Sequence, residues 1–275
     1  MVDKVEGNRQ SVYRSKEGSF APGLRTAPYY LLSVLLLFVI WQIGVTLTSD
    51  TARHFLVPTP AAVAGRFVRL VENGSLAFHV RTTLLEMGLG LLMGTAVALI
   101  LGYAVAHNRV IAYLLEPVIV TSQAVPIIAL APLLTIWFGP GLASKVVVCG
   151  LIVFFPILVN VTTGLKSIDP QLRDLFRLLE ASPTQVLLHL EAPAAMPAFL
   201  SGLKVGGTLS AMGAVVGEFV ASTRGLGYLV KQGQNLYDLP MMFVAIIALM
   251  VIATSIYALL TLLERRVLHW QQGER

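Results

Sequence analysis

The chain alternates long apolar runs with shorter polar segments. Six of these runs approach the roughly 20 residues that an α-helix needs to cross a bilayer. The predicted transmembrane helices are 29–48, 83–106, 113–137, 144–164, 202–222 and 241–263. We therefore predict an all-α polytopic membrane protein. Its single six-helix domain covers residues 29–267, between a polar segment 1–28 and a short tail 268–275.

One polar segment, residues 168–202, separates the fourth and fifth apolar runs and carries strong helix-boundary signals. Asp169-Pro170 offers an N-cap followed by a proline at the first helical position. Ser182 and Gln185 have the spacing of a capping box, which begins a second short helix. The prolines expected to end that helix are Pro193 and Pro197. The segment, called the elbow below, is thus predicted to be a rigid helical bend that meets a soluble partner.

A further short helix is expected outside the spans, after Thr59-Pro60. Its apolar residues recur at helical spacing on one face: Val63, Phe67, Leu70 and Val71. This pattern fits either an amphipathic helix in the outer membrane interface or a helix packed against a neighbouring loop.

Small residues line one face of the second and of the fifth predicted span. Such residues let helices approach closely in lipid, where packing drives association. The second span has Gly90, Gly94, Ala98 and Gly102, for which we expect static packing. The fifth span has Gly206, Gly207, Ser210, Gly213 and Gly217. We expect this second face to line a pathway, because it directly precedes a charged residue.

That charged residue is Glu218. A carboxylate inside a membrane is costly unless it is paired, protonated or facing water. Glu218 therefore indicates either a position near a translocation path or a partner group that fixes helix packing. Two further carboxylates, Glu86 and Glu116, lie near span ends and are interpreted as interfacial or structural.

The third predicted span contains three prolines, at 117, 126 and 132, each of which frees a backbone carbonyl. Ser122 and Gln123 lie beside Pro126 in this broken region. Their polar groups could bond a solute or simply satisfy neighbouring helices.

The composition agrees with a membrane protein. Of 275 residues, 56% are hydrophobic and only 13% are charged, whereas globular chains carry about a quarter charged residues. The net charge of +5 is explained by basic flanks beside anionic lipid and not by nucleic acid. The single cysteine, Cys149, is expected to be a small buried hydrophobe. The five histidines are scattered, so no metal site is expected.

The distribution of basic residues orients the chain. If the N-terminus is inside, the inner segments hold 13 of the 20 lysines and arginines and the outer segments hold 7. The positive-inside rule therefore predicts that both termini and the elbow face the cytoplasm.

Several motifs carry a family resemblance, in order along nearly the whole chain. They are LVPTP (56–60), PxxAxxP (126–132), WFGPGLASK (137–145), FFP (154–156), GLGYL (225–229) and ERRxxxW (264–270). Together they resemble the nitrate, sulfonate and taurine branch of bacterial ABC-importer permeases. The elbow is similar to the cytoplasmic coupling loop of these permeases, with Asp174 at the acidic position and Ala192-Pro193 at the Leu-Pro position.

The elbow also departs from that family pattern. Leu175 and Phe176 replace two alanines, and Glu180 replaces a glycine. Because a glutamate is less suited than glycine to a tight turn, we expect a looser bend here or a salt bridge from Glu180 to the partner.

The resemblance implies a type I ABC-importer permease fold, in the bacterial inner membrane. A second copy of the chain or a paralogue would complete the pore, cytoplasmic ATPase subunits would grip the elbow, and an extracytoplasmic binding protein would deliver the solute. The implied ATPase-coupling residues are Asp174, Leu175, Phe176, Leu179, Glu180, Ala181 and Ser182. The implied pathway residues are Ser122, Gln123, Pro126, Ser210, Gly217 and Glu218.

The chain contains no G-x-x-x-x-G-K-[ST] phosphate loop. We therefore expect a non-catalytic subunit that binds no cofactor, with ATP and Mg²⁺ held by the partner ATPase. The branch serves nitrate, sulfonates and taurine, and also heteroaromatic vitamin precursors such as pyrimidines and riboflavin. VVGEFVAS and GLGYL look closer to the vitamin-precursor members.

Two other classes of protein compete with this interpretation. An ion-coupled secondary transporter would use Glu218 as its coupling carboxylate, but the inverted repeat that it needs is not evident. A membrane-embedded enzyme would need clustered catalytic polar residues inside the spans, which one isolated glutamate does not supply.

Overall fold

The computed structural model describes residues 27–47 and 57–269, so most of the segment 1–28 and of the tail 268–275 lies outside the described residues. All regular structure in the described part is helical. The elements are α2 (Ala27–Leu47), α4 (Pro60–Glu72), α5 (Ser75–His107), α6 (Arg109–Gln123), α7 (Ile127–Phe138), α8 (Leu142–Lys166), α9 (Pro170–Leu178), α10 (Pro183–Val186), the π-helix η1 (Leu187–Glu191), α11 (Ala192–Ala221), α12 (Leu226–Leu236) and α13 (Leu239–Val267).

The helices confirm the all-α class. Four of them are long and apolar enough to cross a membrane: α5, α8, α13 and the continuous run Pro183–Ala221, which contains α11. The pair α6 and α7 qualifies together as a fifth. Helix α2 forms where the first span was expected, and its apolar stretch is Phe38–Leu47. The count of six spans therefore stays a prediction.

The third predicted span, 113–137, is broken as its prolines indicate, but only at one of the three. Helices α6 and α7 meet at an angle of 103°. The break falls at Pro126, which has extended backbone angles and no N–H to continue the helix. Pro117 and Pro132 are by contrast accommodated inside α6 and α7.

The fifth predicted span, 202–222, begins too late, because Pro193 and Pro197 do not end the helix. At η1 the hydrogen bonding widens, and the N–H of Ala192 bonds the carbonyl of Leu187, five residues back. Pro193 then falls in the first turn of α11, where a missing N–H is tolerated. The elbow is therefore continuous with α11.

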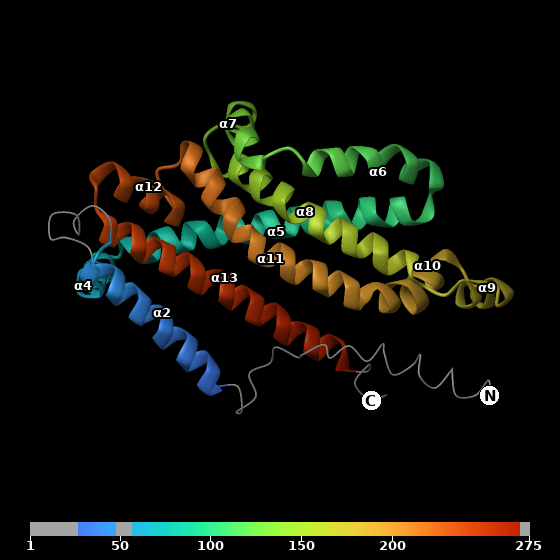
Figure 1. Ribbon diagram of the computed structural model, residues 1–275. Helices are drawn as coiled ribbons and strands as arrows, with labels where there is room; N and C mark the ends of the chain where they lie inside the picture. The colour runs from blue at the N-terminus through green and yellow to red at the C-terminus, as the bar shows by residue number, and fades with distance from the viewer. Residues whose placement is uncertain (1–26, 48–56, 270–275) are drawn as a thin grey trace. The chain divides into compact units, whose positions relative to one another are not determined.

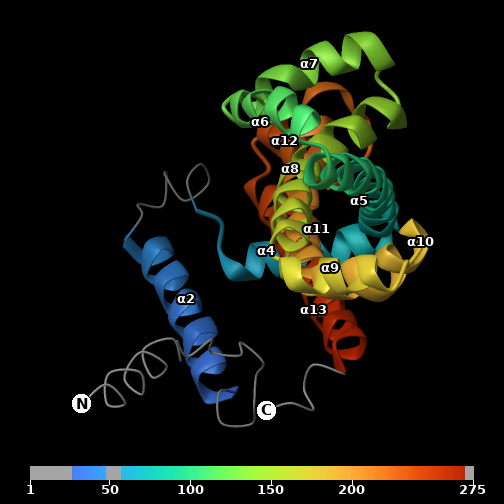
Figure 2. The ribbon, with the colours of Figure 1, turned by 90° about the vertical axis from the view of Figure 1, so that its right-hand side faces the viewer.

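The described residues from 57 to 269 belong to one compact unit in which α8 lies between α5 and α11. The long helices run side by side, with α9 and α10 at one end of the bundle and α4 and α12 at the other (Figure 1). The view along the bundle separates α5, α8 and α11 (Figure 2). Two apolar cores form along α8, around Val153 to Leu165 and around Val148.

Small residues explain how closely α5 approaches α8. A Cβ on Gly94 would lie 2.6 Å from the carbonyl oxygen of Gly150, so the two backbones touch there. Gly90 and Gly102 meet α8 in the same way, at Cys149 and Val161. Static packing of this face, and the burial of Cys149, are therefore confirmed.

The small face of α11 packs in the same manner. A Cβ on Gly213 would lie 2.8 Å from the Cα of Cys149 in α8, and one on Gly207 would lie 2.6 Å from Leu260 in α13. Ser210 is fully buried and donates its hydroxyl to the Gly207 carbonyl. In this chain the face that we expected to line a pathway is thus a packing face.

Helix α4 begins as predicted, with the Thr59 side chain accepting from the N–H of Ala62. Val63 and Leu70 are buried, while Phe67 and Val71 are about half exposed. Helix α4 packs on the helices α5 and α13 and not on a loop, and its location in the membrane interface stays a prediction.

Candidate functional site

The elbow forms as its capping signals predict. The Asp169 carboxylate accepts from the N–H of Gln171 at 2.8 Å and starts α9. Ser182 and Gln185 form the capping box, in which the Ser182 N–H donates to the Gln185 side chain at 2.8 Å. The two short helices therefore have stable ends on both sides of the bend.

The bend itself is tighter than expected at Glu180. This residue adopts a left-handed conformation, with φ of +52°. The Ala181 N–H bonds the Phe176 carbonyl and the Glu180 N–H bonds the Arg177 carbonyl, each at 3.0 Å. This pair of bonds is the Schellman motif that normally places glycine at such a position. The expectation of a looser bend is therefore wrong, because the turn holds the glutamate in the conformation of a glycine.

Glu180→Gly is expected to stabilise the elbow by about 1 kcal/mol, since glycine adopts a left-handed conformation without the penalty that an L-side chain carries. Thermal unfolding of the purified protein would show a raised midpoint. Glu180→Ala is the matched control: it removes the same charge but keeps a Cβ, so no comparable gain is expected. An equal gain in both variants would show that the charge, and not the backbone, is responsible.

One side of α9 leaves leucines uncovered at the end of the bundle. Leu175 is 48% exposed, Leu179 is 68% exposed and Leu178, which the sequence analysis did not single out, is 82% exposed. Asp174 and Arg177 lie beside them in an exposed ion pair of 3.1 Å. This combination of apolar and charged side chains suits a protein surface as partner.

Phe176 differs from the other residues expected on that surface. It is half-buried and packs on the core that contains Leu165, Ile168 and Leu190. Phe176 thus fastens α9 to the bundle. Ser182 is exposed and Ala181 is half-buried at the bend.

A second group of polar residues surrounds Glu218, which is fully buried. The Thr83 hydroxyl donates to Glu218 Oε1 at 2.7 Å, and the N–H groups of Gly227 and Tyr228 donate to Oε2. Because these two N–H groups belong to the first turn of α12, the carboxylate occupies the anion-binding end of that helix. Glu218 therefore joins α5, α11 and α12.

Two further hydrogen bonds, which side chains of α5 accept, complete this attachment of α12. The Leu226 N–H donates to Thr83 Oγ1 at 2.8 Å, and the Gly225 N–H donates to His79 Nδ1 at 2.9 Å. Gly225 has φ of +100°, and an added Cβ would collide with the Glu218 carboxyl. The glycines of the GLGYL motif thus allow the chain to close over Glu218. Helix α12 was not predicted, although Leu226, Leu229, Val230 and Gly233 share one buried face.

Glu86 has the structural role that was one of its two interpretations, because it is only 1% exposed and lies beside Glu218 inside the bundle. Its carboxylate pairs with the Lys145 ammonium at 3.3 Å, and Lys145 also donates to Ser222 Oγ at 2.7 Å. The sequence separates these partners too widely to reveal the pair. Glu116 is half exposed and pairs with Lys166 at 2.8 Å, which agrees with a structural role.

A cavity of about 640 Å³ opens beside this ion pair, between the ends of α5, α8 and α11. Its polar lining includes Glu86, Lys145, Ser222 and Arg224. Charged and hydroxyl groups of this kind can bind the polar edge of a small solute.

The structure does not bring all the expected pathway residues together. Ser122 and Gln123 lie near the end of α6, where their side chains bond the carbonyls of Val118 and Ile119 in their own helix. Pro126 is exposed at the bend between α6 and α7. Ser210, Gly217 and Glu218 are buried in α11. Among the described residues, no cluster of His, Cys, Asp and Glu could hold a metal ion.

The chain is similar to a large family of membrane proteins. Residues 90–269 match the family described as the binding-protein-dependent transport system inner membrane component. The riboflavin transport system permease protein RibX of Chloroflexus aurantiacus is 43% identical over 87% of this chain and 89% of its own length. The formylaminopyrimidine transport permease protein ThiX of Halalkalibacterium halodurans is 34% identical over 88% of this chain and 96% of its own length.

A solved structure shares the fold. A chain of the MetNI methionine ABC transporter, in an inward-facing conformation, superposes with a TM-score of 0.62 at 19% sequence identity. The match covers 69% of this chain and 94% of that chain.

Proposed function

Because the chain belongs to the binding-protein-dependent transport system inner membrane component family, we propose that it passes a small heteroaromatic solute across the bacterial inner membrane. It is the permease subunit of an ABC importer, and the alternative of an ion-coupled secondary transporter is not favoured. The observation that carries the mechanism is the elbow, whose uncovered leucines and charges lie at one end of the bundle.

The partners proposed for this chain follow from that role. Cytoplasmic ATPase subunits, which hold ATP and Mg²⁺, dock on the elbow, and an extracytoplasmic binding protein delivers the solute at the opposite end. A second permease subunit, the same chain or a paralogue, completes the pore. ATP binding draws the ATPases together and displaces the elbows, so that the spans alternate between two arrangements.

The proposed solute class rests on the relatives named for riboflavin and for formylaminopyrimidine. Both compounds are flat nitrogen heterocycles that present hydrogen-bond donors and acceptors at one edge. The cavity beside Lys145 offers such an edge an ammonium, a carboxylate and a hydroxyl. The expected pathway role of Ser122, Gln123, Pro126, Ser210, Gly217 and Glu218 remains part of this proposal.

The solute class is tested with the extracytoplasmic binding protein that delivers solute to this permease. Calorimetric titration with riboflavin, an aminopyrimidine, taurine and an alkylsulfonate is expected to give saturable binding to one of the two heterocycles. Vesicles that contain the permease, the ATPase and this binding protein should then accumulate that compound only with ATP inside. Tight binding of taurine or a sulfonate instead would contradict the proposed class.

The proposed orientation, with both termini and the elbow in the cytoplasm, is tested by cysteine labelling from outside the cell. Cysteines at Asn73 and Gln234 are expected to react with a membrane-impermeant maleimide, whereas cysteines at Asn8 and Gln272 should react only after lysis. Cys149 is fully buried and leaves little background. External reaction at Gln272 would contradict the proposed orientation.

A further inference from the structure

The elbow is tied to the bundle by a charged residue on the inner side of α9. Arg173 donates a guanidinium N–H to the carbonyl of Leu165, in the last turn of α8, at 2.9 Å. The same guanidinium nitrogen lies 3.6 Å from Glu191 Oε1, at the end of η1. Asp174 and Arg177 have 66% and 80% exposed side chains and pair with each other, so they do not serve this attachment.

Glu191 is the centre of the attachment. It is 2% exposed, and His107 Nε2 lies 2.7 Å from the same Oε1 oxygen. His107 is the last residue of α5, and its Nδ1 bonds the carbonyl of Tyr103 at 2.9 Å. The Oε1 oxygen of Glu191 is therefore shared by Arg173 of α9 and His107 of α5.

The attachment coincides with an irregular point in a long helix. The run Pro183–Ala221 is continuous, and η1 is its π-helical part. π-helical turns are local points of kinking inside longer helices and frequently occur at functional sites. Movement of α10 relative to α11 would therefore concentrate at η1, where Glu191 lies.

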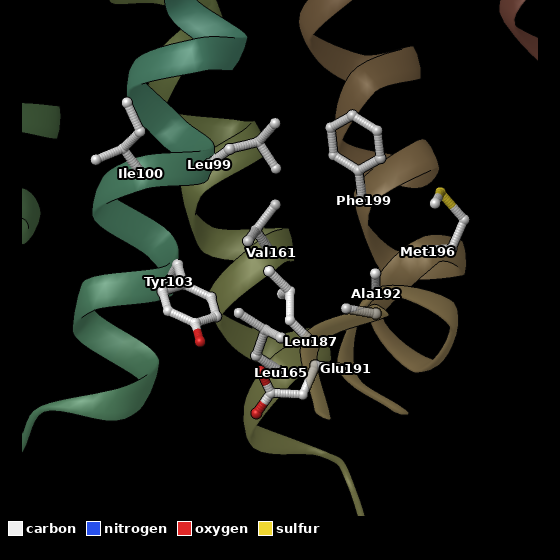
Figure 3. A pocket seen from close by; sticks show the side chains of 11 residues that line it. Leu99, Ile100, Tyr103, Val161, Leu165, Leu187, Glu191, Ala192, Met196 and Phe199 are labelled. Carbon is white, nitrogen blue, oxygen red and sulfur yellow. The ribbon is translucent and has the colours of Figure 1, made fainter. Parts of the chain in front are cut away.

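Apolar packing between α5 and α11 is interrupted next to Glu191. A cavity of about 520 Å³ lies there, with Val161 and Leu165 of α8 at its back. Figure 3 shows Leu99 and Tyr103 of α5 on one side of the space and Phe199 of α11 on the other, with Glu191 at its lower end. Beside this cavity, α5 and α11 are joined mainly by the polar contacts of Glu191 and less by apolar side chains that pack against each other.

We propose that Arg173, Glu191 and His107 form a joint that transmits displacement of the elbow to α5, α8 and α11. The proposal rests on the proposed docking of ATPase subunits on the elbow. All three are positioning residues: Arg173 and Glu191 lie on the inner side of the elbow, His107 ends α5, and their contacts hold these helix ends together. Phe176 also packs α9 on the core, so the elbow should stay folded when the contacts of Arg173 are removed.

The joint is tested by amide hydrogen exchange of the purified permease–ATPase complex, with and without ATP, Mg²⁺ and vanadate. In the wild type, trapping of the complex with ATP, Mg²⁺ and vanadate is expected to change the rate of amide exchange in α9, in η1 and in the last turns of α5 and α8. Arg173→Ala and Glu191→Gln are expected to keep the change in α9 but to lose it in α5 and η1. Arg69→Ala, which removes the same charge from the exposed side of α4 at the other end of the bundle, should behave as the wild type.

Three further outcomes test the joint separately from ATPase docking at the elbow. Arg173→Lys, which keeps the positive charge, should restore part of the change in α5. Persistence of the full change in α5 and η1 in both Arg173→Ala and Glu191→Gln would overturn the joint while leaving docking at the elbow intact. If amide exchange in α9 of the wild type did not change, ATPase docking at the elbow would be contradicted. The joint, which rests on that docking, would then be contradicted too.

Discussion

Replacement of residues 174–182 by a Gly/Ser segment of equal length is expected to abolish both co-purification of the ATPase subunits and solute uptake. The replacement removes the exposed Leu175, Leu178 and Leu179, and it also removes the Schellman turn and the N-cap that hold them in place. Few interface residues supply most of the binding energy, and burial of each exposed leucine on docking would remove apolar surface from water. Affinity purification through a tag on the permease would measure the loss directly.

A point substitution distinguishes the loss of leucine contacts with the ATPase from the loss of the elbow's conformation. Leu179→Ser keeps the turn and is expected to weaken ATPase binding by about tenfold or more, as loss of an anchor worth at least 1.4 kcal/mol would do. Leu236→Ser is the matched control, because Leu236 is 63% exposed at the other end of the bundle.

Glu180→Lys should uncouple ATP hydrolysis from uptake, and an opposite charge change on the ATPase should partly restore coupling. Retained ATPase binding and uptake in the Gly/Ser variant would show that this segment is not the coupling element.

Glu218→Ala is expected to lower the free energy of unfolding by about 3–5 kcal/mol, the usual range when one partner of a buried charged contact is removed. The substitution leaves the Thr83 hydroxyl and the N–H groups of Gly227 and Tyr228 without their acceptor in a water-poor interior. Helix α12 should then separate from α5 and α11 before the rest of the bundle unfolds. Thermal unfolding in detergent, followed by circular dichroism, measures the effect.

Glu116 provides the matched control for Glu218. Its carboxylate is 52% exposed and pairs with Lys166 on the surface, so Glu116→Ala should change the free energy of unfolding by less than about 1 kcal/mol. Thr83→Val preserves the shape but removes both of its hydrogen bonds, and an intermediate loss of about 1–3 kcal/mol is expected. If Glu218→Ala unfolds like the wild type but fails to transport, Glu218 acts on the path and not in packing.

Local signals along the sequence were sufficient for the elbow. An N-cap at Asp169, a proline at the first helical position and the Ser182 capping box each involve residues within three positions of one another. Their energetics depend on neighbouring backbone groups and little on the rest of the fold, so they can be recognised in the sequence. The left-handed Glu180 escaped prediction, because its side chain disfavours the conformation that the surrounding turn enforces.

Prolines predicted the ends of helices less well than capping residues did. Pro126 breaks a helix, whereas Pro132, Pro193 and Pro197 lie within helices or in their first turn. A proline removes one donor and crowds the preceding turn, but whether the helix bends depends on which neighbours can compensate. At Pro193 the widened turn of η1 precedes the proline, and no pattern in the sequence indicated it.

The sequence by itself determined the helical class, the apolar runs and the ends of the short elbow helices, because hydrophobic length and capping are local properties. Only the tertiary structure decided which partners the buried charges take. Glu218 meets Thr83 across 135 residues, His107 meets Glu191 across 84, and Lys145 meets Glu86 between different helices. A buried charge must find a partner, but which one it finds depends on the rotation and contact of helices that are distant in the chain.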